Sequence, residues 1–355
     1  MPHCSAPSDA RIDIVYLWVN GNDPKWRAKR HRAAQQHDAI KHSAMALYGN
    51  VEGRFRDNDE LRYSLRALER YFPDHGHVYL VTDGQTPSWL KPSSRLTLVD
   101  HRDLIPARQL PTFDSAHIES YVHRIPGLSE RFFYFNDDVF FGAPVQLDHW
   151  FWPGGVVAQW SDDPVVEGTA LRCDDNALEN ASRLSAQWLS RLPGYTHTPR
   201  TFAHSPRPLL KSLLCAAEAE APELFSRVRS TVFRTWASPT LVSDFVLRWA
   251  LARGVASIRQ GVHQHVTTGC ADQAQQLDAL LASAGELDFF CVNDTTDDAH
   301  GHDPRLAKVR AALQTLFPLA SRFENDPAGL GHAPPHAPHA PHRHLSRPRS
   351  SHQLA

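Results

Sequence analysis

The first 150 residues alternate short apolar runs with amphipathic segments, and this alternation most strongly constrains the fold. Strands are predicted at residues 11–20, 77–84, 94–101 and 131–135, and helices from Pro24 and over residues 57–73 and 115–125. Strands that alternate with helices favour an α/β fold with a mostly parallel, doubly wound sheet and helices on both faces. In such a sheet, ligands bind beyond the carboxyl ends of the strands. Polar residues follow each predicted strand, so several polar strand ends are expected to meet in one crevice.

The stretch RFFYFNDDVFFG (131–142) places Asn136, Asp137 and Asp138 in the middle of an apolar run. Two adjacent carboxylates in an apolar setting repel each other unless a cation lies between them. The pattern is explained if FFYF is a central strand and the three polar residues lie at its carboxyl end. Carboxylate oxygens there suit Mg²⁺ or Mn²⁺, ions that also bind phosphate oxygens. The alternative is a capped turn with no ligand.

Composition excludes several classes of function. The net charge is −2, with no basic stripe, so binding to nucleic acid or to an anionic membrane surface is not expected. No run of about 18 apolar residues predicts a membrane span, and the N-terminus lacks the apolar core of a secretory signal. Five widely spaced cysteines without a C-x-x-C motif indicate free thiols in a reducing cytosol.

The sequence predicts one catalytic domain over residues 11–326. It follows a short extension (1–10), and a Pro- and His-rich disordered tail (327–355) follows it. We divide the domain into a nucleotide-sugar-binding half (11–150) and an acceptor or catalytic half (151–326). In the second half, helices are predicted over residues 174–189, 206–230, 238–254 and 303–318, and a strand over 287–294. Pro222 is expected to interrupt the second of these helices. The third is expected to begin at a Ser238 cap and to end at Gly254.

Four blocks of the chain, in order, resemble the Stealth family of sugar-1-phosphate transferases. That family includes bacterial capsular polysaccharide phosphotransferases and the catalytic subunit of the lysosomal-enzyme N-acetylglucosamine-1-phosphotransferase. The blocks are IDIVYLWVNGNDPKW (12–26), the segment from RFRDNDELRYSLRALERYFP (54–73) through residue 142, AHSPRPLL (203–210) with RVRSTVFR (227–234), and FFCVNDTTDDAHGHDPRLAKVRAALQTLFP (289–318).

The resemblance implies a fold like that of the nucleotide-diphospho-sugar transferases. It also implies transfer of a sugar-1-phosphate, typically N-acetylhexosamine-1-phosphate, from a UDP-sugar to a glycan hydroxyl in capsular or exopolysaccharide synthesis. UMP leaves, and the cofactor is Mg²⁺ or Mn²⁺. The expected location is the cytoplasm or the inner face of the membrane, alongside a polysaccharide assembly complex. The alternatives are a metal-dependent glycosyltransferase that releases UDP, and a catalytically silent protein that binds nucleotide sugars or glycans.

Site residues follow from the same resemblance. Asp137 and Asp138 match the family's metal and phosphate position, His204 its catalytic histidine and Arg234 its functional arginine. His204 would act as a general base or as a phosphoryl carrier, and we favour the base. A further carboxylate, Asp13, is a candidate for catalysis, or else a loop cap.

The remaining candidates are substrate-binding residues. They are Asn20, Gly21, Arg56, Asp59, Arg62, Asn136, Asn293 and Asp294. Gly21 would allow a ligand to approach the backbone closely, and the charged residues at 56–62 would bind donor phosphate or simply begin a helix. Residues 150–200 carry no recognisable motif, so the acceptor is left open.

Overall fold

The structure, a computed structural model, describes residues 11–41 and 45–325, without the side chains of 38–41. The described residues through Glu324 belong to one compact unit. The predicted extension (1–10) and tail (327–355) lie outside the described residues. The proposed division of the catalytic domain at residue 150 stays a prediction.

A five-stranded sheet forms the centre of this unit, with the strand order β3-β2-β1-β4-β8. Its strands are β1 (Ile12–Leu17), β2 (Val78–Thr82), β3 (Leu96–Asp100), β4 (Arg131–Asn136) and β8 (Arg207–Leu210). The first four are parallel, and β8 runs antiparallel to β4. Strands β1 and β2 are buried along their whole length, as expected for central strands covered on both faces. The predicted α/β fold with a mostly parallel sheet is confirmed.

Two smaller sheets flank the first. The first small sheet has the strand order β10-β11-β5 and consists of β10 (His263–Thr268), β11 (Phe289–Asp294) and β5 (Val139–Phe141). The second has the strand order β6-β7-β9 and consists of β6 (Phe151–Trp152), β7 (Gly155–Ala158) and β9 (Ala256–Ile258). The chain leaves the five-stranded sheet after Asn136 and enters the first small sheet at Val139. Only two residues, Asp137 and Asp138, make this crossing.

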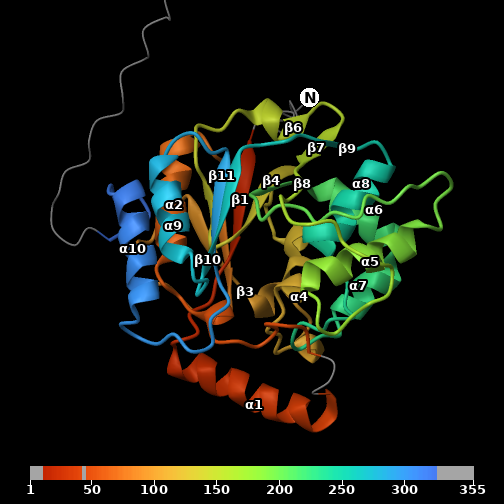
Figure 1. Ribbon diagram of the computed structural model, residues 1–355, viewed down its shortest axis with the longest axis horizontal. Coiled ribbons are helices and arrows are strands. Elements are labelled where there is room, and N and C mark those ends of the chain that lie inside the picture. Colours follow the sequence, from red (N-terminus) through yellow and green to blue (C-terminus); the bar gives the residue numbers. More distant parts are fainter. Residues whose placement is uncertain (1–10, 42–44, 326–355) are drawn as a thin grey trace, which may run out of the picture. The chain divides into compact units, whose positions relative to one another are not determined.

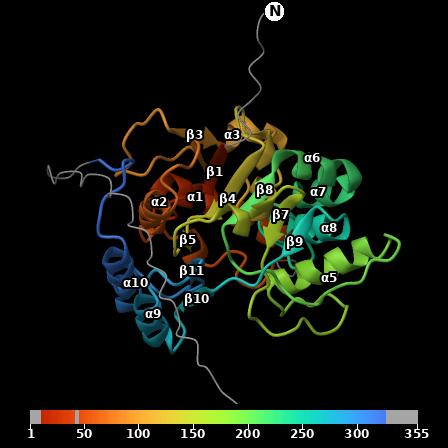
Figure 2. The same cartoon turned by 90° about the horizontal axis from the view of Figure 1, so that it is seen from above.

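Helices cover the strands from two sides (Figures 1 and 2). On one side lie α2 (Glu60–Tyr71), α9 (Gln273–Ala282) and α10 (Pro304–Leu316), and on the other α5 (Ala177–Leu189), α6 (Lys211–Glu220), α7 (Pro222–Val228) and α8 (Val246–Ala252). The remaining α-helices are α1 (Pro24–Lys41), α3 (His101–Leu104) and α4 (Ser115–Glu119). In α2 the leucines at positions 61, 65 and 68 are buried, which confirms the helical spacing seen in the sequence.

Three of the predicted elements differ in the structure. Residues 207–210 form a strand instead of the start of a helix, because Pro206 and Pro208 disfavour helical geometry in the residue before each. Strand β8 is an edge strand, where a proline is tolerated. The helix predicted over 115–125 stops at Glu119, and the one over 238–254 begins with a π-helical turn, η6 (Leu241–Phe245). Its predicted end is confirmed, since Gly254 has a φ of +70°.

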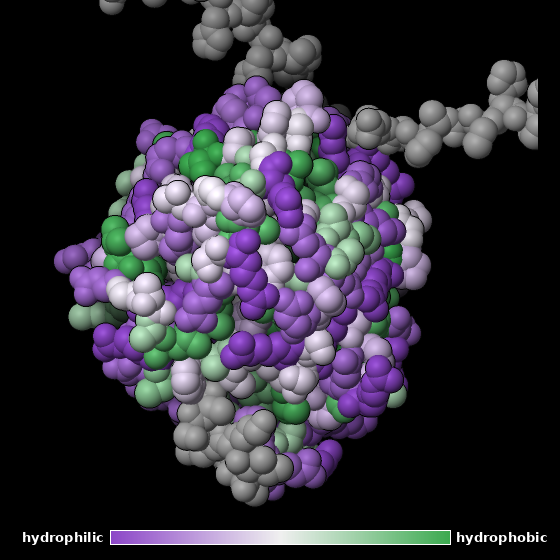
Figure 3. Space-filling view, turned by 90° about the vertical axis from the view of Figure 1, so that its right-hand side faces the viewer, coloured by the Kyte–Doolittle hydropathy of each residue, from purple (hydrophilic) through white to green (hydrophobic). Residues whose placement is uncertain are grey.

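Aromatic packing joins the sheets. Phe140 of β5 stacks on Phe290 of β11 with ring centroids 4.7 Å apart, and Phe133 of β4 meets Phe141 edge to face at 5.3 Å. On the face seen in Figure 3, hydrophobic residues lie scattered among hydrophilic ones, as on most protein surfaces. Within the described residues, no helix combines the length and the apolar character needed to cross a membrane.

Candidate active site

The Asn136–Asp138 segment lies where two sheets meet. Asn136 ends β4, and Val139 begins β5, which pairs antiparallel with β11. This pairing brings the carboxyl end of β11 beside the start of β5, and the Val292 N–H donates to the Asp138 carbonyl at 2.9 Å. Asn293 and Asp294 therefore lie near the two aspartates, although about 150 residues of sequence separate them.

His204 reaches the same place through β8. Because β8 runs antiparallel to β4, with Tyr134 opposite Arg207, the residues before Arg207 lie beside the residues after Tyr134. The His204 ring stacks on that of His265 from β10, with centroids 5.0 Å apart and planes 7° from parallel. The imidazole is thus held at the carboxyl end of β4.

Arg234 is positioned by the amino end of α4. Phe113 donates its backbone N–H to the Val232 carbonyl, so the segments before α4 and before Arg234 run side by side. The Arg234 guanidinium donates to Ser115 Oγ at 2.7 Å and lies 3.6 Å from a carboxylate oxygen of Asp114. A second guanidinium, that of Arg54, donates to the same Ser115 oxygen at 3.1 Å.

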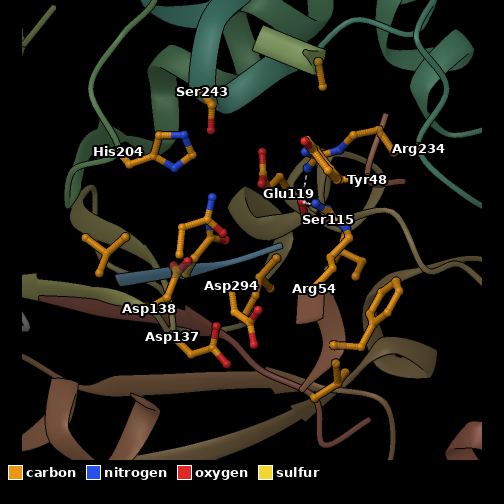
Figure 4. Close-up of a pocket in the computed structure, with 18 of the residues that line it drawn as sticks. Tyr48, Arg54, Ser115, Glu119, Asp137, Asp138, His204, Arg234, Ser243 and Asp294 are labelled. Atoms are coloured by element: carbon orange, nitrogen blue, oxygen red, sulfur yellow. Dashed lines mark hydrogen bonds between the residues drawn. The ribbon is translucent and has the colours of Figure 1, made fainter. Parts of the chain in front are cut away.

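These groups line one cavity of about 280 Å³ (Figure 4). Eight predicted site residues line it: Arg56, Asn136, Asp137, Asp138, His204, Arg234, Asn293 and Asp294. In Figure 4 the carboxylates of Asp137 and Asp138 lie on one side of the cavity and the two arginines on another, with His204 and Ser243 above the two aspartates. The sequence prediction that carboxylates, an imidazole and a guanidinium share a site agrees with this arrangement.

Burial sets the charge state of several lining groups. It raises the pKa of Asp137 well above its usual value, helped by the neighbouring Asp138, and it raises the pKa of Asp138 to about 6. Burial, with His265 and nearby arginines, lowers the pKa of His204 to about 3, so its imidazole is neutral at pH 7. The cavity therefore combines acidic groups that resist ionisation with a neutral histidine.

A divalent cation fits the acidic side of the cavity as one part of a larger ligand set. Asp138 Oδ1 is buried, and no hydrogen-bond partner reaches it from the described residues. Those residues contain no cluster of three His, Cys, Asp or Glu side chains arranged to hold a metal by themselves. Mg²⁺ commonly takes one or two carboxylates and completes its shell with water and substrate phosphate. Asp137 and Asp138 could hold such an ion once a phosphorylated ligand is present.

Asp13, predicted as catalytic, lies away from the cavity. It is near the amino end of β1, whereas the cavity opens beyond the carboxyl ends of β1 and β4. Its buried carboxylate accepts backbone N–H groups of His77 and Ser129 at 2.7 and 2.9 Å and the Arg11 guanidinium at 2.9 Å. These contacts match the loop-capping alternative: in the structure, the Asp13 carboxylate caps backbone N–H groups of two loops.

We expect Asp13→Ala to destabilise the fold without changing turnover of the folded fraction. The substitution leaves two backbone donors buried without an acceptor, which costs about 2–4 kcal/mol of unfolding free energy. Urea unfolding measures the loss, and Asp13→Asn, which keeps one acceptor oxygen, should lose less. A stable Asp13→Ala variant with strongly reduced turnover would instead support the catalytic role.

Four other predicted residues also lie outside the cavity lining. The Asn20 backbone exchanges hydrogen bonds with the Gln85 side chain, and Gly21 packs so closely that a Cβ there would lie 2.3 Å from the Phe55 carbonyl oxygen. The glycine is therefore needed for packing against Phe55. Asp59 precedes α2 in a left-handed conformation, and Arg62 pairs with Glu324.

Many lining residues besides Arg54 are absent from the sequence predictions, and Glu119 and Ser243 are two polar examples. Glu119 is buried at the end of α4, accepts the Tyr134 hydroxyl at 2.9 Å and keeps its second oxygen without a partner among the described residues. Burial raises the pKa of Glu119. Ser243 lies on η6, and π-helical turns are frequent at functional sites. A lone Glu in the apolar segment SAHIESYVHRI was the available signal for Glu119; the sequence gives none for Ser243.

The fold and the cavity define an α/β protein with a polar, charged cavity beyond the carboxyl ends of its strands. Three regions described for Stealth proteins match the chain: conserved region 1 at residues 10–38, conserved region 2 at 54–158 and conserved region 4 at 278–335. The chain belongs to the Stealth family, as its sequence blocks indicated.

Curated relatives share about a third of their aligned residues with the chain. An exopolysaccharide phosphotransferase of Streptomyces coelicolor, SCO2592, is 35% identical over 321 residues, which cover 88% of this chain and 33% of that protein. Exopolysaccharide phosphotransferase CpsY of Mycobacterium tuberculosis is 33% identical over 88% of this chain and 58% of its own length. Capsular polysaccharide phosphotransferase cps1A of Actinobacillus pleuropneumoniae is 37% identical over 57% of this chain and 55% of its own. The chain thus spans between a third and somewhat over half of these relatives.

Among solved structures, the galactosyltransferase LgtC in complex with donor and acceptor sugar analogs aligns over 87% of this chain and 96% of its own. The TM-score is 0.42 and the sequence identity 10%.

Proposed function

We propose that this protein is a phosphotransferase of capsular or exopolysaccharide synthesis. It moves a sugar-1-phosphate, N-acetylhexosamine-1-phosphate, from a UDP-sugar to a hydroxyl of a glycan, and forms a phosphodiester and UMP. The relatives described as exopolysaccharide and capsular polysaccharide phosphotransferases support the reaction class. Within this proposal the protein works in the cytoplasm or at the inner face of the membrane, alongside a polysaccharide assembly complex.

One observation carries the proposal: a neutral imidazole, a guanidinium and paired carboxylates from three distant segments line the same cavity. Phosphoryl transfer needs little covalent chemistry from a protein beyond positioning and charge stabilisation. The cavity supplies both, with Arg234 on one side and Asp137 and Asp138 on another.

In the proposed reaction, His204 accepts the proton of the acceptor hydroxyl as its oxygen attacks the phosphorus nearest the sugar. The new phosphorus–oxygen bond forms while the bond from that phosphorus to the oxygen bridging to UMP breaks. The proton remains on His204, and UMP leaves as an anion. Arg234 binds the phosphate oxygens in two-point fashion and stabilises the charge that develops on them. A divalent cation held by Asp137 and Asp138 would neutralise charge on the diphosphate.

His204 could instead attack the phosphorus and carry the phosphoryl group as a covalent intermediate. The stereochemistry at phosphorus separates the two routes. Direct attack by the acceptor inverts the configuration, whereas a single phosphohistidine intermediate gives two inversions and net retention. We expect inversion.

The identity of the released nucleotide tests the proposal. We expect purified protein, incubated with a panel of UDP-sugars, Mg²⁺ and short glycan acceptors, to release UMP, which chromatography separates from UDP. Mass spectrometry of the glycan should find a sugar-phosphate added. Release of UDP alone would indicate the glycosyltransferase instead, and saturable binding without turnover would indicate the silent binding protein.

A further inference from the structure

Two arginines meet at one end of the cavity. Arg54, beside the start of the second sequence block, and Arg234 each donate a guanidinium hydrogen to Ser115 Oγ, at 3.1 and 2.7 Å. Both line the cavity, and Figure 4 draws them together on the side away from His204. Their positive charges therefore face the same space, with one neutral hydroxyl between them.

Among the described residues, the carboxylates near this pair lie at or beyond the edge of ion-pair distance. Arg234 has Asp114 at 3.6 Å, but no carboxylate within the described residues lies at ion-pair distance from Arg54. The Nε atoms of both arginines are buried, and neither hydrogen-bonds to any described residue. Burial, and then the charge of Arg234, lowers the pKa of Arg54 to about 10, although the carboxylates of Asp114, Glu119 and Asp138 act in the opposite direction. A buried cation without a partner is costly, and a second cation beside it increases that cost.

The neighbouring Arg56 provides the contrast. Its guanidinium is taken up by the Asp294 carboxylate, by Thr296 Oγ1 at 3.0 Å and by the Ala299 carbonyl at 2.6 Å. Sequence reasoning named Arg56 as a phosphate ligand, yet its donors are engaged within the protein. Arg54, two residues earlier, keeps donors free.

We propose that Arg54, Arg234 and Ser115 form a binding site for a phosphate group, with Arg54 as a phosphate-binding residue alongside Arg234. A tetrahedral oxyanion accepts from two guanidinium forks at once and supplies the charge that the pair lacks. If the proposed function holds, this phosphate is one of the two in the nucleotide-sugar donor. The other then lies toward Asp137 and Asp138, across the cavity in Figure 4.

Phosphate binding to the purified protein tests this site independently of turnover. Calorimetric titration with inorganic phosphate in EDTA removes any contribution from a divalent cation. We expect Arg54→Gln to raise the Kd for phosphate by about 10- to 100-fold, the loss expected for hydrogen bonds to a charged group. Arg102→Gln is the matched control, because Arg102 is exposed and pairs only with Asp100 among the described residues; its Kd should equal that of the unmodified protein.

Two further measurements exclude a merely structural role for Arg54. Arg54→Lys keeps the charge but not the planar fork, so its Kd should lie between those of the unmodified protein and Arg54→Gln. The ligand-free melting temperature of Arg54→Gln should equal or exceed that of the unmodified protein, because an unpaired buried charge is removed. An equal Kd for phosphate in all three proteins would overturn the inference.

The outcome is separable from that of the proposed function. Arg54-dependent phosphate binding in a protein that releases no UMP would leave the anion site in place and remove the donor assignment. UMP release by a protein whose phosphate affinity does not depend on Arg54 would overturn the site alone.

Discussion

Asp138→Asn is expected to lower the rate of UMP release by about 10²- to 10⁴-fold, as for loss of a group that stabilises charge in the transition state. The amide has nearly the shape of the carboxylate but lacks the negative charge needed to hold a divalent cation beside the diphosphate. Asp138 Oδ1 is buried without a hydrogen-bond partner among the described residues, although the carboxyl group also interacts with the Cys291 thiol. Steady-state assays with saturating UDP-sugar measure the effect.

The melting temperature of Asp138→Asn should not fall, because burial already disfavours the ionised form and raises the pKa of this carboxyl to about 6. Asp174→Asn serves as the matched control, since Asp174 is exposed and pairs with Arg172 at the surface. Its rate should equal that of the unmodified protein. A normal rate in Asp138→Asn would show that the acidic side of the cavity has no part in the chemistry.

His204→Ala is expected to reduce turnover by a similar two to four decades, the range for loss of a general base. The imidazole is neutral at pH 7 because burial lowers its pKa to about 3, and the negative charge of a bound diphosphate would raise that pKa and make the ring a stronger base. We expect kcat to fall more than the Kd for the donor rises, because the base acts on the acceptor hydroxyl. Rapid-quench kinetics and donor titration together measure this split.

His31→Ala, at an exposed position of α1, is the control for loss of an imidazole, and its kinetics should not change. Retention of most of the activity by His204→Ala would remove the proposed base. A parallel loss of donor binding and turnover, without a separate effect on kcat, would assign His204 to donor binding instead.

The parallel sheet could be predicted because its strands β1, β2 and β4 are buried and read as continuous apolar runs between turn residues. Strand β8 could not. Its four-residue run RPLL lies directly before a helical pattern, and only the pairing with β4 makes it a strand. Strand β5 was hidden for a similar reason: VFF continues the apolar run of β4, and the change of sheet occurs within two polar residues.

The residues that the structure brings together in the cavity include polar residues at or just after strand ends. Asn136–Asp138 after β4 and Asn293–Asp294 at the end of β11 converge because the carboxyl ends of these strands meet. Asp13 lies at the amino end of a parallel strand, and hence at the opposite edge of the sheet from the cavity. The predicted strand over residues 11–20 already placed Asp13 at that end, so the sequence itself carried the signal against a place in the crevice.

The arginines near the start of α2 show a second limit of prediction from sequence. Arg54, Arg56 and Arg62 are alike in sequence, and each stands in a polar stretch before or within the helix. Their roles depend on distant partners: Arg56 pairs with Asp294 and Arg62 with Glu324, whereas Arg54 faces Arg234. No local pattern reveals contacts that span more than 170 residues.

The central claim is that the acceptor attacks phosphorus and leaves the bond between the sugar and its oxygen intact. A UDP-sugar labelled with ¹⁸O at the oxygen joining the sugar to the diphosphate tests it most directly. The account predicts that mass spectrometry will find the label in the phosphodiester product and none in the released nucleotide. Label recovered in released UDP would mean that the sugar–oxygen bond was broken, and would contradict the account.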